Sequence, residues 1–163
     1  MKNSTIYFLP IVAGEWCGYR SKEEWKAHAS KVVWPLMGYF EKTSAGVQVN
    51  LRQQDSTSDW LVDDKYTLDS TGQITELRRT IFYFSDDERK ETTYLIQGGR
   101  AIVTQNKAFS LKTSAPLKLP LPMDEYESWK IYTRTADFPF SQLLKESIKV
   151  PSTGPYCTKE TTP

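Results

Sequence analysis

Hydrophobic residues along this chain change their spacing once, close to residue 35. In residues 22–33 the apolar positions Trp25, Ala29 and Val32 recur at the spacing of one helix face. Beyond Pro35 the apolar residues alternate with polar ones, which places them on one face of successive strands. The pattern therefore predicts one early helix followed by an antiparallel meander.

The start of the predicted helix carries a recognisable capping signal. Ser21 is followed three positions later by Glu24, the pattern in which the hydroxyl accepts from the third helical amide and the acid bonds back to the cap. Trp34-Pro35 ends the periodic segment, because the residue before proline is disfavoured in helical geometry. We expect a helix over about residues 22–33.

The strands predicted beyond the helix are separated by turns rich in Gly, Asp and Ser. A further strand precedes the helix, a proline-rich connector covers residues 115–122, and a short helix is expected over about residues 140–148. The strands fall at residues 5–12, 36–42, 47–54, 59–68, 73–84, 90–96, 100–111 and 128–135.

These elements predict a mainly β fold, bordering on α+β, in which about eight antiparallel strands form a barrel or a strongly curved sheet. The helix packs on this sheet. Residues 1–150 are expected to form a single β-rich domain, and residues 151–163 a polar tail that Cys157 could pin. A length of 163 residues suits one domain with its own core.

Charge and hydropathy exclude some partners. The chain has 21 basic and 20 acidic residues, so no net field attracts it to nucleic acid. No apolar run approaches the roughly 20 residues of a membrane-spanning helix, so no transmembrane segment is predicted. A small apolar or amphipathic molecule remains the expected partner, and the sequence indicates no particular protein partner.

Cys17 and Cys157 are the two cysteines, and they lie near opposite ends of the chain. A disulfide between them would close a very long loop and stabilise the fold by up to about 5 kcal/mol. The alternative is two unrelated thiols. A disulfide would favour an exported protein, periplasmic or extracellular, over a cytoplasmic one.

Catalytic and metal-binding residue types are scarce. His28 is the single histidine, and the acidic pairs lack the spacing of a calcium loop, so neither a metal nor a cofactor is predicted. A non-catalytic role is favoured. The enzymatic alternative is a hydrolase or isomerase in a cone of helix and sheet, with Asp64 or His28 as base.

Two predicted strands place charged groups beside large aromatic residues. Trp60, Asp64 and Tyr66 share one face of residues 59–68, and a carboxylate among apolar residues is either paired or functional. If this face and one face of residues 73–84 enclose a cavity, the predicted ligand-binding residues are Trp60, Asp64, Tyr66, Arg78, Phe82 and Tyr94.

The alternative for these strands is structural. Arg78 could pair with Asp64 or Glu76 and face solvent, which would contribute only a few tenths of a kcal/mol.

Gly14-Glu15-Trp16 resembles the G-x-W motif of calycins, the group of lipocalins and fatty-acid-binding proteins. The order of elements is similar, with a helix after the motif, a strand meander and a late cysteine. The resemblance implies a ligand-binding barrel that Trp16 closes. Two features depart from it: the proline-rich connector interrupts the meander, and Tyr132-x-Arg134 stands where fatty-acid-binding proteins have Arg-x-Tyr.

The sequence thus favours a non-catalytic protein that binds a small hydrophobic or amphipathic, lipid-like ligand between the concave face of the sheet and the helix at residues 21–33. An interaction or assembly module without a pocket is the main alternative.

Overall fold

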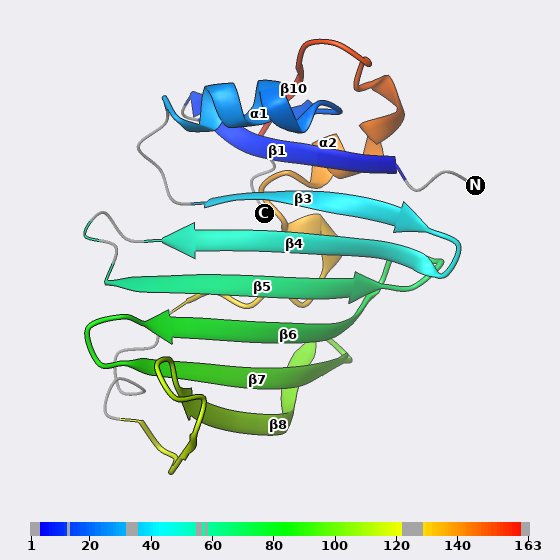
Figure 1. The fold of residues 1–163 in the computed structure, drawn as a ribbon. Coiled ribbons are helices and arrows are strands. Elements are labelled where there is room, and N and C mark those ends of the chain that lie inside the picture. Colours follow the sequence, from blue (N-terminus) through cyan, green and yellow to red (C-terminus); the bar gives the residue numbers. More distant parts are fainter. Residues whose placement is uncertain are drawn as a thin grey trace.

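The computed structural model describes residues 4–12, 14–31, 36–54, 57, 59–121 and 129–160, which form one curved, antiparallel ten-stranded sheet with two short α-helices (Figure 1). The strand order is β10-β2-β1-β3-β4-β5-β6-β7-β8-β9. The two ends of this order do not pair, so the sheet curves without closing into a barrel. The mainly β prediction is confirmed.

Consecutive hairpins build the middle of the sheet, as the alternating pattern predicted. The first strand of the chain, β1, covers Ser4–Val12 and pairs with both β2 and β3. The meander consists of β3 Leu36–Thr43, β4 Gly46–Gln54, β5 Trp60–Leu68, β6 Ile74–Tyr83, β7 Glu88–Gln97 and β8 Arg100–Ser110.

Two strands at one edge were not predicted. They are β2, Glu15–Tyr19, and β10, Tyr156–Lys159, which pair with Cys17 directly opposite Cys157. These cysteines form a disulfide, with Cα atoms 4.0 Å apart. Part of the predicted polar tail is therefore a strand of the sheet; residues 161–163 lie outside the described residues.

The predicted strand at residues 128–135 is wrong for the part that the structure describes. Residues 129–133 belong to no helix or strand, and the 3₁₀ helix η2, Thr135–Asp137, follows. Side chains satisfy this backbone instead: Arg79 donates to the carbonyls of Trp129 and Lys130. The proline-rich connector contributes only β9, Pro116–Leu117, on the edge of β8.

The helix α1 covers Lys22–Ala29, so its start agrees with the prediction and its end comes earlier. The Ser21 hydroxyl accepts from the Glu24 amide at 3.2 Å. The Glu24 carboxylate accepts from the Gly154 amide, which ties α1 to the C-terminal segment. Residues 32–35 lie outside the described residues. In the predicted C-terminal helix region, α2 covers Ser141–Lys145 and the 3₁₀ helix η3 covers Ser147–Lys149.

The two faces of the sheet differ in what lies on them (Figure 1). We call the side that bears Phe8, Phe40 and Tyr66 the covered face, because the C-terminal segment with η2 and α2 packs there. The opposite side, which bears Tyr39 and Arg78, is called the open face. On the open face α1 packs over a small cluster that includes Leu9, Cys17, Tyr19, Trp25 and Met37.

Candidate functional site

The six residues predicted to bind a ligand lie on two opposite faces of the sheet. The register pairs Asp64 with Arg79 and Lys65 with Arg78, so Arg78 faces away from Asp64. On the covered face are Trp60, Asp64, Tyr66 and Tyr94; on the open face are Arg78 and Phe82. The structure therefore does not bring these residues together around one cavity.

Asp64 is paired inside the covered face. Both of its oxygens accept from Arg79 at 2.7 Å, and the side chains are 1% and 4% exposed. Burial opposes the charge on Arg79, but the hydrogen bond and charge of Asp64 outweigh it and raise the pKa of Arg79. Of the two alternatives for a carboxylate among apolar residues, the structure shows the paired one.

Tyr66 packs within the core of the covered face. Its hydroxyl accepts from the Tyr132 amide at 3.2 Å, and its ring lies edge-on to Phe138 with centroids 5.2 Å apart. Burial raises the pKa of Tyr66. Trp60 likewise packs against Trp129, with ring centroids 5.0 Å apart. The C-terminal segment thus covers the face that carries four of the six predicted ligand-binding residues.

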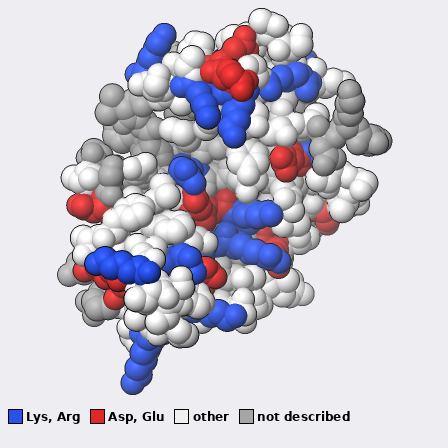
Figure 2. Space-filling model, viewed as in Figure 1, with Lys and Arg blue, Asp and Glu red and all other residues white. Residues whose placement is uncertain are grey.

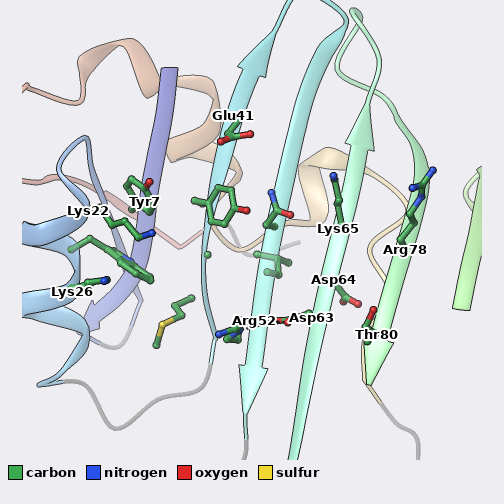
Figure 3. A pocket seen from close by; sticks show the side chains of 16 residues that line it. Tyr7, Lys22, Lys26, Glu41, Arg52, Asp63, Asp64, Lys65, Arg78 and Thr80 are labelled. Atoms are coloured by element: carbon green, nitrogen blue, oxygen red, sulfur yellow. Dashed lines mark hydrogen bonds and ion pairs between the residues drawn. The ribbon is translucent and has the colours of Figure 1, made fainter. Parts of the chain in front are cut away.

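A cleft of about 810 Å³ lies instead on the open face, between α1 and strands β1, β3, β4, β5 and β6 (Figure 3). Arg78 borders it, as does Asp64, whose carboxylate is turned to the covered face. The side chains that matter most to its chemistry are Tyr7, Lys22, Trp25, Lys26, Tyr39, Glu41, Asn50, Arg52, Asp63, Lys65, Arg78 and Thr80.

Three aromatic rings form the wall of the cleft next to α1; we call them the aromatic wall. The Tyr7 centroid lies 5.5 Å from that of Trp25 and 5.8 Å from that of Tyr39. Trp25 is fixed because its indole N–H donates to the Phe8 carbonyl at 3.1 Å. Burial, with a smaller effect of Glu41, raises the pKa of Tyr39.

The charged groups of the cleft divide into paired and unpaired ones. Arg52 donates to both oxygens of Asp63 at 2.8 and 3.0 Å, and Arg78 donates to Glu76 at 2.7 Å. No carboxylate in the described part of the chain lies within 4.0 Å of the lysines that border the cleft, which are Lys22, Lys26 and Lys65.

Basic and acidic side chains both lie over α1, and a second group of basic side chains lies over the middle strands beside acidic ones (Figure 2). Lys22 and Lys26 extend from α1 towards the sheet (Figure 3).

The alternation that predicted the strands also contained the signal for this site, in the polar positions between the core residues. Tyr39, Arg52 and Lys65 occupy the positions between the core residues of their strands, on the face opposite Phe40, Leu51 and Tyr66. The sequence interpretation sought a ligand on the apolar face. Tyr39 occupies a polar position in the alternation of residues 36–42, and the predicted helix contains Trp25. These two aromatic residues could have drawn attention to the opposite face of the sheet.

His28 lies outside the cleft lining. Its Nδ1 lies 3.0 Å from the Glu24 carbonyl, and its ring stacks on Tyr19 with centroids 5.2 Å apart. Among the described residues, no group of three or more His, Cys, Asp or Glu side chains could hold a metal ion. Nor does that part of the chain contain a helix with the length and hydrophobicity to span a membrane. No protein-family model, curated protein or solved structure significantly matches this chain.

Proposed function

We propose that the protein binds a small amphipathic molecule in the cleft between α1 and the open face, without transforming it. Binding sites of this kind combine apolar and aromatic surface with a few fixed polar groups that orient the ligand. The cleft has both, because the aromatic wall borders one side and charged side chains from β4, β5 and β6 border the other.

The observation that carries the proposal is the way α1 is held above the sheet. No residue of the described helix is buried. Its Trp25 and Ala29 pack against the cluster that contains Leu9 and Tyr19. Two hydrogen bonds add to this contact, from the Trp25 indole to the Phe8 carbonyl and from the Gly154 amide to Glu24. The cleft is bordered by Lys22, Trp25 and Lys26 of this helix, and the aromatic wall gives it an apolar side.

The same structure supports a non-catalytic role. Arg79 engages both carboxylate oxygens of Asp64 on the other face, and His28 is placed on Tyr19 away from the cleft. The Cys17–Cys157 disulfide supports a location in an oxidising compartment, such as the periplasm or the extracellular space. The calycin resemblance at Gly14-Glu15-Trp16 concerns element order, and the proposal does not depend on it.

Titration with the neutral aromatic dye N-phenyl-1-naphthylamine tests the proposal. We expect saturable dye fluorescence, with affinity reduced about thirtyfold by Trp25→Ala combined with Tyr39→Ala, since each of the two aromatic contacts contributes about 1 kcal/mol. The control is Phe84→Ala, which removes a half-exposed ring of the β6–β7 turn outside the cleft. A wild-type protein that shows no saturable binding, or equal losses in control and test variants, would exclude this function.

A second candidate function, association between sheet edges, rests on β8. Over residues 100–107 this strand pairs only with β7 among the described strands. Its residues Ile102 and Val103 are 48% and 54% exposed, on opposite faces. Two copies could pair antiparallel along this edge around a twofold axis. Sedimentation velocity at increasing concentration tests this: Val103→Lys should abolish a dimer that forms through β8, and a wild-type monomer at all concentrations would exclude it.

A further inference from the structure

We propose that the cleft selects ligands with an anionic group, and that the ammonium groups of Lys22 and Lys26 bind this group while the apolar part of the ligand lies on the aromatic wall. This inference rests on the proposed function and names its ligand class. The binding site is therefore asymmetric, with the charge-recognising residues on the helix and the apolar contact between helix and sheet.

The placement of Lys22 is unfavourable for the helix itself, and Lys26 lies close enough to repel it. Lys22 is the first helical residue, at the positive end of the helix dipole, where an acidic residue would be stabilising. Lys26 lies one turn later on the same side, in the last turn of the helix, where the dipole favours a basic residue. Like charges at this spacing nevertheless repel by a few tenths of a kcal/mol. Both side chains border the cleft. A bound anion would reverse both unfavourable terms.

The acidic residues closest in sequence are engaged elsewhere. Glu23 accepts from the Ser21 hydroxyl at 3.3 Å, and Glu24 accepts from the Gly154 amide at 3.1 and 3.2 Å. Within the cleft, Glu41 accepts from the Thr5 hydroxyl at 3.3 Å, and Asp63 is held by Arg52. Among the described residues, no carboxylate forms an ion pair with Lys22 or Lys26.

The position of the aromatic wall favours the two helical lysines over the other basic groups of the cleft as the residues that bind the anion. Trp25 lies between Lys22 and Lys26 in the sequence of α1, and its ring packs on Tyr7. An apolar body on these rings brings a short acidic substituent to the two lysines. Lys65 and Arg78 lie across the cleft, on β5 and β6 (Figure 3), and Arg78 already has Glu76 as its partner.

The ligand class is thus a flat or compact apolar body with one carboxylate, sulfonate or phosphate group near its edge. A cleft of about 810 Å³ is within the usual range of roughly 300–1,000 Å³ for sites that bind small organic molecules. Cationic amphiphiles would meet the unpaired lysines and be disfavoured.

Two dyes that differ by one anionic group provide the test. These are 8-anilinonaphthalene-1-sulfonate and N-phenyl-1-naphthylamine, which share the aromatic body and differ in the sulfonate. We expect the sulfonate to bind about tenfold more tightly at low salt, the order expected for two partly exposed charged contacts, and less so at high salt. Lys22→Gln with Lys26→Gln should abolish the tenfold preference and leave the neutral dye unaffected.

Matched variants separate the possible outcomes. Lys31→Gln removes the same charge just beyond α1, outside the cleft, and should preserve the preference. Equal affinity for both dyes in the wild type would overturn the inference while leaving the proposed function intact. The inference would also be overturned if Lys65→Gln abolished the preference for the sulfonate and the combined substitution of Lys22 and Lys26 did not. If neither dye binds saturably, the proposed function itself fails.

Discussion

Two neighbouring arginines of β6 show how differently the two faces of the sheet are used. Arg78 and Arg79 each donate to a carboxylate at 2.7 Å. The Arg78–Glu76 pair on the open face has side chains 66% and 35% exposed, whereas the Arg79–Asp64 pair on the covered face has side chains 4% and 1% exposed. Equal donor–acceptor distances therefore occur in opposite dielectric surroundings.

The difference separates stability from binding within one sheet. On the covered face, the buried pair and two clusters of aromatic and aliphatic residues fix the C-terminal segment to the strands. On the open face, charged side chains remain in contact with water, where an ion pair stabilises little and a ligand can compete for it. Substitutions should therefore affect unfolding on one face and binding on the other.

The disulfide provides the largest expected effect, because it holds the strand that follows the covering segment. Replacement of Cys17 and Cys157 by Ala opens a link between residues 140 positions apart. The chain-entropy model gives a loss of up to about 5 kcal/mol in the free energy of unfolding. Urea unfolding of oxidised wild type and of the double variant measures it; reductant should destabilise the wild type and leave the variant unchanged. Equal stability would mean that β10 is held without the bond.

Arg79→Met should come next, with a loss of about 4 kcal/mol, because it leaves the Asp64 carboxylate buried without its cation. The matched control is Arg78→Met, one residue along the same strand, where we expect a loss below about 0.5 kcal/mol. Urea unfolding of both variants gives the comparison. Similar losses in the two variants would contradict the division between the faces.

Phe138→Ala tests the apolar part of the same division. Phe138 is fully buried and contacts the rings of Tyr66, Tyr132 and Phe140. Its removal should cost about 3 kcal/mol through lost burial and the cavity left behind. Phe84, which is 49% exposed, is the control and should lose less than about 1 kcal/mol on replacement by Ala. Thermal unfolding of both variants checks this ordering.

The meander was predictable because each hairpin is encoded locally. Alternation along residues 36–111 and turn residues such as Asp69 and Gly72 specify strands that pair with their neighbours in sequence. The pairing of β10 with β2 is different, because it joins residues more than 130 positions apart. No local pattern encodes such a contact, and only the two cysteines indicated it.

The candidate site was harder to predict than the fold. The sequence showed which residues share a face within β5 and within β6. A cavity also depends on which face of β5 lies on the same side of the sheet as which face of β6. The pairing register, with its bulge at Thr67–Leu68, determines this. The sequence analysis combined Asp64 with Arg78, whereas the register combines Asp64 with Arg79. A shift of one residue is enough to exchange the faces.

The smallest effect concerns an exposed carboxylate in the turn between β5 and β6, and it sharpens the contrast with the buried Asp64. The Thr71 hydroxyl and the amides of Gln73 and Thr71 donate to Asp69, which lowers the pKa of this carboxyl. Because the folded-state pKa is below that of the unfolded chain, Asp69 stabilises the fold above about pH 4 and loses this contribution as the pH falls further.

Asp69→Asn keeps an oxygen acceptor for the turn but removes the titration. The wild type should therefore lose stability relative to this variant as the pH falls from about 5 to about 2.5, which the urea midpoint measures at each pH. Asp86→Asn, which removes an exposed carboxylate from the turn between β6 and β7, is the control for the loss of one surface charge. If all three proteins follow parallel curves, the hydrogen bonds around Asp69 do not distinguish the folded from the unfolded carboxylate. A divergence confined to Asp69 would show that the hydrogen bonds of this turn, and not the loss of a surface charge in general, cause this part of the pH dependence.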